Sequence, residues 1–353
     1  MVKMTKTLRR LKHVPEAAAR AADLVYVNDE SPGISRRKFG RGFAYYDPAG
    51  KKLPKGDFTD RINALAIPPA YRDVWICPLP NGHLQATGLD DRDRKQYRYH
   101  ERWHEVRDLA KYAHMVEFAR TLPRIRRAVT RDLKLDGLPR ERVLAAVVRL
   151  MDRTHLRIGN DAYAKDNGHF GLTTLLNDHV DFGHGGRMAF NFVGKSGKER
   201  DVTLADPQLA KIVKGCQDLP GQELFAYEDN AAEGGWRDVT STDVNEYLKE
   251  ISGHEGGGGF TAKDFRTWAG TVLAAAGLRD AGPAEGKTAI KKQITQVVKA
   301  TAAELGNTPA VCRKCYIHPA VLDAYASGEV ITPATKRPRG LRADEADTLA
   351  LLT

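Results

Sequence analysis

One stretch of the sequence has residue types suited to contact a polyanion. Residues 92–102 read RDRKQYRYHER, in which cationic side chains alternate with the aromatic rings of Tyr97, Tyr99 and His100. If the stretch is helical, one face carries three cations that could follow a row of phosphates: Lys95, Arg98 and Arg102. The aromatic rings could then lie against sugars or bases. The stretch by itself favours a plainer interpretation, a solvated helix face with one buried aromatic edge.

Other patterns that would supply a cofactor fail on spacing. Residues 194–196 (GKS) and 286–288 (GKT) end like a phosphate-binding P-loop, but each lacks the glycine that this motif needs five positions earlier. Cys312 and Cys315 have CxxC spacing without a second ligand pair nearby, so the four cysteines are interpreted as reduced thiols. We therefore expect no nucleoside triphosphate site, no metal and no cofactor.

Length and composition limit the classes of protein that fit. The chain has 353 residues, 42% of them hydrophobic, which is an ordinary globular composition and long enough for about two domains. Lysine and arginine exceed the acidic residues, so the net charge is +10, an excess that favours nucleic acid or an anionic membrane only weakly. No apolar run approaches a membrane span, and residues 1–13 have no apolar signal-peptide core. We therefore expect a cytoplasmic protein without a membrane partner.

Turn-forming residues divide the first 90 residues into short segments of strand-like composition. The clearest hairpin signal is Asn81-Gly82, which lies between RDVWICPLP and HLQATG. Pro78 and Pro80 predict that the first of these strands is an edge strand, because proline cannot donate to a ladder. Residues 1–90 are therefore predicted to form a small β-rich N-terminal domain.

The remaining chain, residues 91–353, is predicted to be mainly helical. Residues 94–122 lack proline and glycine and carry apolar side chains at mostly helical spacing. A three-stranded meander is expected at 180–204, and the glycines at 256–259 predict a hinge or flexible loop. Further helices are expected at 124–135, 139–154, 206–217, 241–252, 261–276, 287–305 and 308–326. The predicted fold class is α+β, with a larger helical domain that contains a β-meander.

Five blocks of sequence occur in order between residues 83 and 319. They are HLQATG with RKQYRYH (83–100), THLRIGNDAYAKDNGHFGLTTLLNDHV (154–180), FVGKSGKER (192–200), KDFRTWAGT (263–271) and LGNTPAVCRKCYIHP (305–319). In content and order the blocks resemble the type IB DNA topoisomerases, in the short form of poxviruses and bacteria. Each block is longer than a chance motif, so the resemblance is specific. It implies a catalytic domain similar to that of tyrosine recombinases.

The resemblance implies roles for five residues of this chain. It places the nucleophile at Tyr316, two catalytic arginines at Arg157 and Arg266, and a general-acid lysine at Lys195. Asn307 occupies a fifth position, where poxvirus members have histidine. An asparagine amide can donate a hydrogen bond to a phosphoryl oxygen but lacks the charge of an imidazolium, so we expect a weaker contact there. We expect asparagine in place of histidine to affect the rate of the reaction more than its type.

Elementary chemistry is consistent with these roles. Attack on a phosphodiester builds negative charge on the phosphoryl oxygens, and arginine offers them two parallel charged donors. A tyrosine with a pKa of about 10 is almost entirely protonated at neutral pH, so nearby cations must favour its phenolate. A lysine between Gly194 and Gly197, at a flexible turn, could protonate the leaving 5′-hydroxyl. Candidate DNA contacts are Lys95, Tyr97, Arg98, Tyr99 and Lys263.

The implied function is relaxation of supercoiled duplex DNA, at the nucleoid, by a monomeric clamp formed from the two domains. One strand would be cut through a 3′-phosphotyrosyl link, rotated about the intact strand and resealed, without ATP or a required metal. A tyrosine recombinase is the alternative enzyme, and an architectural DNA-binding protein is the alternative without activity. Taken singly, each candidate residue has a plain structural explanation: packing for Tyr316, helix capping for Arg157, and solvated surface charge for Arg266 and Lys195.

Overall fold

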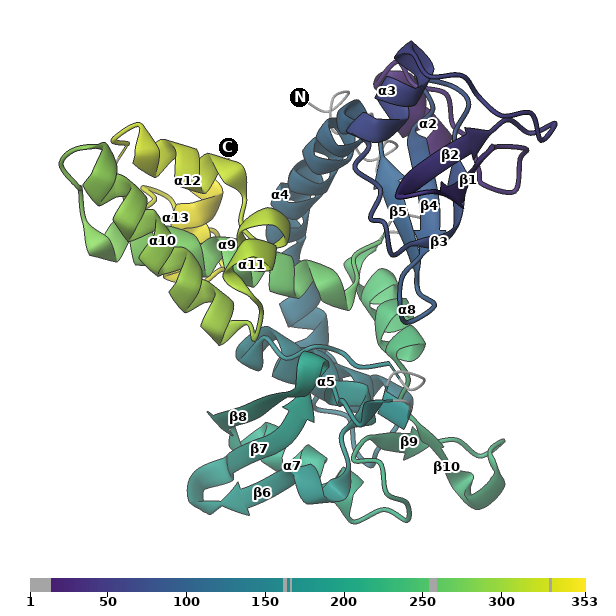
Figure 1. The fold of residues 1–353 in the computed structure, drawn as a ribbon. Helices are drawn as coiled ribbons and strands as arrows, with labels where there is room; N and C mark the ends of the chain where they lie inside the picture. The colour runs from purple at the N-terminus through teal and green to yellow at the C-terminus, as the bar shows by residue number, and fades with distance from the viewer. Residues whose placement is uncertain (1–13, 161–163, 166, 254–258, 330–331) are drawn as a thin grey trace. The chain divides into compact units, whose positions relative to one another are not determined.

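The computed structural model describes most of the chain, namely residues 14–160, 164–165, 167–253, 259–329 and 332–353. Two compact units, Met1–His114 and Met115–Thr353, are described separately below (Figure 1). The fold mixes helices with antiparallel sheets, which confirms the predicted α+β class. The domain boundary predicted near residue 90 stays a prediction. Most of the predicted glycine hinge, residues 256–258, lies outside the described residues.

The first unit is built on a five-stranded antiparallel sheet with the strand order β2-β1-β3-β4-β5. Its strands are β1 (Ile34–Phe39), β2 (Gly42–Tyr46), β3 (Arg72–Ile76), β4 (Leu84–Leu89) and β5 (Lys95–Tyr99). Two short helices accompany the sheet, α2 (Pro15–Ala21) and α3 (Asp57–Ala64). A small core packs α3 on the sheet through Ile34, Ile62, Val74, Ile76 and Ala86.

The predicted hairpin is confirmed, but the predicted edge strand is wrong. Strands β3 and β4 pair antiparallel, with Trp75 opposite Thr87 and Ile76 opposite Ala86. However, β3 lies between β1 and β4, inside the sheet. The strand ends at Ile76, so Pro78 falls beyond the ladder, where a missing N–H costs nothing.

The helix predicted to begin near residue 94 begins later, because the basic and aromatic stretch is strand β5. The stretch alternates with a period of two, so Lys95, Tyr97 and Tyr99 share one face of the sheet and Arg98 points to the other. The proposed single face with Lys95, Arg98 and Arg102 is therefore wrong. Helix α4 (Glu101–Asp132) follows and continues through Pro123, since one lost hydrogen bond does not end a helix of 32 residues.

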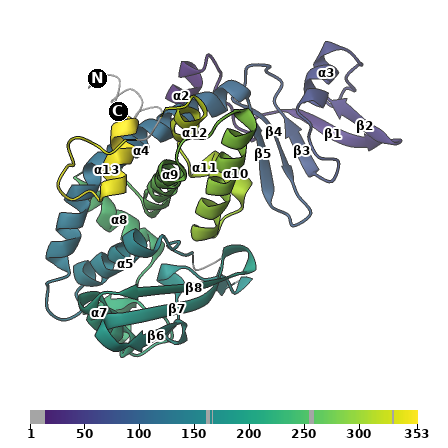
Figure 2. The ribbon, with the colours of Figure 1, turned by 90° about the vertical axis from the view of Figure 1, so that its left-hand side faces the viewer.

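The second unit is mainly helical. Its remaining helices are α5 (Arg140–Thr154), α7 (Pro207–Gln217), α8 (Ser241–Ser252), α9 (Ala262–Ala281), α10 (Lys287–Glu304), α11 (Pro309–Cys315), α12 (Pro319–Ala326) and α13 (Ala343–Leu351). Helix α5 is buried along most of its length and forms the centre of this unit. In Figure 2, α9 to α12 lie together on one side of it, and they share an apolar core. Within the described ranges, no helix is both long and apolar enough to cross a membrane.

The predicted meander is present as three antiparallel strands in the order β6-β7-β8. They are β6 (Val180–Gly183), β7 (Arg187–Gly194) and β8 (Lys198–Ala205). Met188, Phe190 and Phe192 alternate along β7 and are buried, as the period-two pattern requires. The long β7–β8 pairing ends at Gly194 opposite Lys198, so the intervening turn presents Lys195. A further two-stranded ribbon consists of β9 (Ala226–Glu228) and β10 (Trp236–Asp238).

The helix predicted over residues 308–326 is two helices with a break at Tyr316. Helix α11 ends at Cys315, and α12 begins at Pro319. The residue before a proline is disfavoured in the helical conformation, and His318 is accordingly extended, with φ −66° and ψ 126°. Tyr316 is thus the C-terminal cap of a short helix rather than one position on a longer amphipathic face.

Candidate active site

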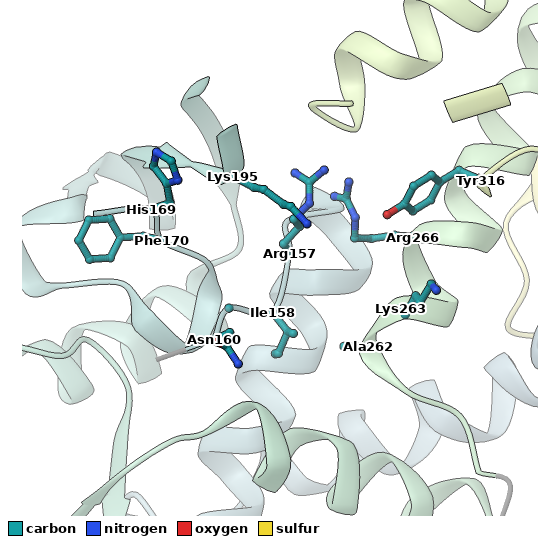
Figure 3. Close-up of a pocket in the computed structure, with 11 residues that line it drawn as sticks. Arg157, Ile158, Asn160, His169, Phe170, Lys195, Ala262, Lys263, Arg266 and Tyr316 are labelled. Carbon is teal, nitrogen blue, oxygen red and sulfur yellow. The ribbon is translucent and has the colours of Figure 1, made fainter. Parts of the chain in front are cut away.

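Four of the five predicted catalytic residues line one cavity in the second unit. The cavity has a volume of about 340 Å³, and its lining includes Arg157, Lys195, Arg266 and Tyr316, together with the predicted DNA contact Lys263. Figure 3 shows that these side chains come from separate elements: the end of α5, the β7–β8 turn, α9, and the end of α11. Segments far apart in the sequence therefore meet at one place. Four residues with unrelated structural roles would have no need to lie together.

Arg266 is a buried charge held by backbone carbonyls. Arg266 is only 5% exposed. Its guanidinium donates to the carbonyl oxygens of His155 and of Leu305, the latter at 2.6 Å. Burial, and then the neighbouring Arg157, lower the pKa of Arg266 to about 10, so the group remains protonated at neutral pH. Its Nε is buried and has no hydrogen-bond partner among the described residues. The guanidinium is thus fixed in direction, with its Nε–H unused among the described residues.

The chain leaves α5 through a left-handed cap shortly before Arg157. His155, the C-cap, has φ 56°, which turns the chain away from the helix axis two residues before Arg157. The guanidinium of Arg157 donates to the side-chain oxygen of Asn307 and, at 3.3 Å, to the carbonyl of Gly306. Burial lowers the pKa of Arg157, and the nearby Tyr316 opposes that shift.

Asn307, the fifth predicted residue, is not among the residues that line the cavity. Because its side-chain oxygen accepts from Arg157, its amide nitrogen is the group that remains. That Nδ2 is buried and makes no hydrogen bond within the part of the chain that the structure describes. A buried donor without a partner is costly, so its position beside Arg157 is consistent with a hydrogen bond to a ligand oxygen.

Tyr316 is held by the backbone around it. Thr271 of α9, which is fully buried, donates through its hydroxyl to the carbonyl of Tyr316 at 3.1 Å and accepts from the amide of His318 at 3.0 Å. Gly270 permits this close approach, since a Cβ there would lie 2.8 Å from the Tyr316 carbonyl oxygen. The same helix carries Arg266, whose Cζ lies 5.6 Å from the centre of the Tyr316 ring. In Figure 3 the phenol oxygen points toward the two arginines.

Lys195 sits on a different kind of support. It occupies the turn between β7 and β8, where Ser196 (φ 68°) and Gly197 (φ 69°) are both left-handed, and it is exposed. In Figure 3 its side chain extends toward Arg157 and Arg266. The lysine therefore reaches the cavity from a surface turn, as the sequence predicted for the candidate proton donor.

Two cations and two small residues of the site were not singled out from the sequence. Lys198 donates to the Asn307 carbonyl at 3.2 Å, and Arg200 donates to the Glu304 carbonyl at 3.1 Å, so β8 holds the segment that carries Asn307. Their spacing of two on a strand was the available signal, because it places both on one face. Gly270 and Thr271 gave no such signal, since their role depends on Tyr316, which is 45 residues beyond Thr271.

The predicted DNA contacts of the first unit lie on strand β5. Lys95 Nζ is 2.5 Å from Asp29 Oδ2, and the rings of Tyr97 and Tyr99 are stacked with centroids 6.0 Å apart. On the opposite face of the strand, Arg98 donates to the carbonyl of Ala66 at 3.1 Å. Tyr97 is half exposed, with a ring available for contact. Their part in DNA binding stays a prediction.

The cysteines are free thiols, as predicted. Cys312 is fully buried in the core that packs α9 to α12, and burial raises its pKa to about 11, so it is an inert packing residue at neutral pH. In the described ranges, no three histidine, cysteine or acidic side chains gather into a group that could hold a metal ion.

The sequence left open a topoisomerase, a tyrosine recombinase and an architectural DNA-binding protein, and comparison with known families decides among them. Residues 100–334, more than half of the chain, match the family described as eukaryotic DNA topoisomerase I, catalytic core. The chain belongs to the type IB DNA topoisomerases. Residues 42–90 also match the bacterial DNA topoisomerase IB N-terminal domain. The predicted family and enzyme class, an isomerase that acts on DNA, are thereby confirmed.

Individual relatives of this topoisomerase agree with the family assignment. The chain is 32% identical to the DNA topoisomerase 1B of Acanthamoeba polyphaga mimivirus over 299 residues, which is 83% of this chain and 87% of the relative. It is 22% identical to vaccinia virus DNA topoisomerase 1B, over 72% of this chain and 75% of the relative. A fungal relative, DNA topoisomerase 1 of Mycosarcoma maydis, is 24% identical over 70% of this chain but only 26% of its own length.

Proposed function

We propose that this topoisomerase relaxes supercoiled duplex DNA by transient cleavage of one strand through Tyr316. The phenol oxygen attacks phosphorus and forms a 3′-phosphotyrosyl ester, while the bond to the 5′ oxygen breaks and that oxygen leaves as a hydroxyl. One ester bond forms as another breaks, so the link retains the energy needed for religation, and neither ATP nor a metal is required. The observation that carries the proposal is the convergence of Tyr316, Arg157, Arg266 and Lys195 on one cavity.

The arginines would stabilise the charge that develops on the phosphoryl oxygens. Arg266 is fixed by two carbonyl acceptors, and Arg157 is fixed by Asn307 and Gly306. Donors that are already oriented need no rearrangement as charge builds, which is the largest single contribution to many enzymatic rates. The unused Nδ2 of Asn307 is a third donor suited to the same oxygens.

Lys195 would act as the general acid that protonates the leaving 5′ oxygen. Proton transfer by a positioned side chain contributes roughly 10²–10⁴ in rate, provided that the side chain comes within hydrogen-bond reach. An exposed turn with a long side chain allows that approach. In religation the neutral lysine would accept the proton of the attacking 5′-hydroxyl. Lys263, which also lines the cavity, is assigned to a neighbouring phosphate.

The remaining steps depend on how DNA is held. We infer that a single copy of the chain closes as a clamp on the duplex, with Lys95, Tyr97, Arg98 and Tyr99 of β5 as contacts of the first unit. Contacts with the backbone would give binding that weakens with salt and has little sequence preference. Rotation of the cut duplex about its intact strand then releases supercoils before Tyr316 is displaced.

The proposal is tested with negatively supercoiled plasmid in EDTA and without ATP, with detergent added to trap covalent complexes. The wild-type protein should relax the plasmid and form a detergent-stable adduct. Tyr316→Phe should bind DNA with unchanged affinity yet neither relax it nor form an adduct. Tyr325→Phe is the matched control, since its hydroxyl donates to the carbonyl of Gly282 at the end of α9, away from the cavity lining, and it should retain relaxation. Relaxation by Tyr316→Phe, or loss of wild-type relaxation in EDTA, would overturn the assignment.

A further inference from the structure

Helix α13 carries two buried carboxylates and lies beyond the part of the chain that matches the topoisomerase catalytic core. Glu345 is 4% exposed and Asp347 is 3% exposed, whereas the family match ends at residue 334. A buried carboxylate is stable only when it is paired and hydrogen bonded. Each of the two has an arginine partner on another helix, and the two partners lead to different parts of the second unit.

Glu345 belongs to a cluster of four charges that joins α13 to α4 and α5. Arg126 of α4 donates twice to Glu345, at 2.7 Å each, and twice to Asp152 of α5, at 2.8 and 2.9 Å. Arg342, the N-cap of α13, donates to the side chain and the carbonyl of Asp152, both at 3.1 Å. Figure 2 shows α13 lying beside α4. Bidentate arginine–carboxylate pairs fix direction as well as distance, so the cluster determines where Asp152 stands.

Asp152 is in the last turn of α5, immediately before the segment that builds the active site. Three residues later, the carbonyl of His155 accepts from Arg266, and Arg157 follows after two more. The turn is therefore held on one side by α13 and α4 and on the other by the buried guanidinium of Arg266. A cavity of about 140 Å³ adjoins it and is lined in part by Asp152, His155 and Glu345. That open volume gives the turn room to shift if the cluster is broken.

We propose that Glu345 is a positioning residue for the cleavage reaction, acting with Arg126 through Asp152 to fix the end of α5. This fixes the His155 carbonyl, which orients Arg266, and the point from which Arg157 departs. The inference rests on the proposed roles of these two arginines. A displacement of about 1 Å at reacting groups can cost on the order of a hundredfold in rate. A small shift of the end of α5 would therefore be enough to slow cleavage.

Asp347 offers a matched control on the same helix. It accepts from Arg279 of α9 at 3.1 Å and from the amide of Ala334 at 2.8 Å. Both carboxylates are buried, both are paired with arginine, and both help to dock α13. None of the partners of Asp347 described here belongs to α5. Loss of either charge should therefore weaken the docking of α13, but only loss of Glu345 should disturb the arginines of the active site.

The test compares Glu345→Gln with Asp347→Asn in single-turnover cleavage of a duplex oligonucleotide at saturating protein, with DNA affinity and thermal unfolding measured on the same samples. Both variants should unfold at lower temperature than the wild type. Only Glu345→Gln should slow cleavage, by about tenfold, with unchanged affinity for DNA. In an Arg266→Ala background, Glu345→Gln should slow cleavage by a clearly smaller factor than in the wild type, because one of the two groups that it positions is gone.

Arg342→Met is the second variant in case Glu345→Gln does not fold, since the Arg342 side chain is 42% exposed and its loss is better tolerated. It removes one hold on Asp152 and should slow cleavage about threefold. Equal slowing by Glu345→Gln and Asp347→Asn, or slowing by Glu345→Gln that persists undiminished in the Arg266→Ala background, would overturn the inference while leaving the proposed function intact. Absence of a wild-type adduct in the same assay would instead remove the proposed function and the inference together.

Discussion

Arg266 and Lys195 face the same cavity from supports of opposite character. Arg266 is 5% exposed, lies on a long buried helix and is fixed by the carbonyls of His155 and Leu305. Lys195 is exposed and lies on the turn of a hairpin that has two consecutive left-handed residues. Both are cations, yet the fold immobilises one and leaves the other at the surface. The contrast is consistent with the different tasks proposed for the two charges.

The difference follows from what each task needs. A group that stabilises developing charge is most effective when it is oriented before the reaction begins, in a site that excludes water. Burial of a guanidinium is costly and lowers the pKa of Arg266, but at about 10 it leaves the charge in place at neutral pH. A proton donor must instead approach a leaving oxygen and later withdraw a proton from it, so a long amine side chain on a surface turn is suitable.

The largest effect is expected from Arg266→Ala, which removes the fixed charge. Single-turnover cleavage should fall by roughly a thousandfold, in the range seen when one oriented donor is removed from a charge-stabilising site. Arg266→Lys should not restore the rate, because one ammonium cannot serve two carbonyls and a phosphoryl oxygen in the geometry of a guanidinium. Recovery of most of the rate by lysine would show that charge alone matters, and it would contradict the proposed distinction between the oriented Arg266 and the surface Lys195.

A smaller effect, roughly a hundredfold, is expected from Lys195→Ala, and it should depend on the leaving group. A DNA substrate with sulfur in place of the bridging 5′ oxygen releases a thiolate, which needs no proton. Cleavage of this substrate by Lys195→Ala should approach the wild-type rate, whereas Arg266→Ala should remain slow with it. Equal rescue of both variants, or of neither, would contradict the separate roles.

The next effect, about tenfold to a hundredfold, is expected from Gly270→Ala. Its new methyl group would lie 2.8 Å from the Tyr316 carbonyl oxygen, a backbone atom that cannot easily move aside. Overpacking of this kind costs about 1–3 kcal/mol of unfolding free energy and would displace the nucleophile. Gly277→Ala is the control on the same helix, since its methyl group would meet only the side chain of Val297. If both variants cleave at the same rate, the fixed support of Tyr316 is less important than its contacts suggest.

Much of the candidate site could be predicted from the sequence because its residues stand in long local blocks. Tyr316, Arg157, Arg266 and Lys195 were each named from such a block, and the structure places all four on one cavity. What positions them could not be predicted in this way. The carbonyl of His155 reaches Arg266 across 111 residues, and Arg126 reaches Glu345 across 219. Contacts at such separations leave no periodic signal in the chain.

The errors in the predicted fold have local causes of the same kind. The absence of proline and glycine suggested a helix from residue 94, although the alternation of cations and aromatic rings in RKQYRY has the period of a strand. Apolar spacing likewise joined α11 and α12 into one helix, whereas Pro319 and the hydroxyl of Thr271 break it at Tyr316. In both places a local feature of a few residues decided the secondary structure against the average pattern of the segment.

Identification of the residue that becomes linked to DNA tests the proposed role of Tyr316 most directly. The wild-type protein would be incubated with a duplex labelled on the cleaved strand, trapped with detergent, and digested with trypsin and nuclease. Tryptic cleavage after Lys314 and Lys336 releases a peptide that contains both Tyr316 and Tyr325, and fragmentation in a mass spectrometer distinguishes them. We expect a 3′-phosphonucleotide on Tyr316. An adduct on any other residue, or one attached to a 5′ end, would contradict it.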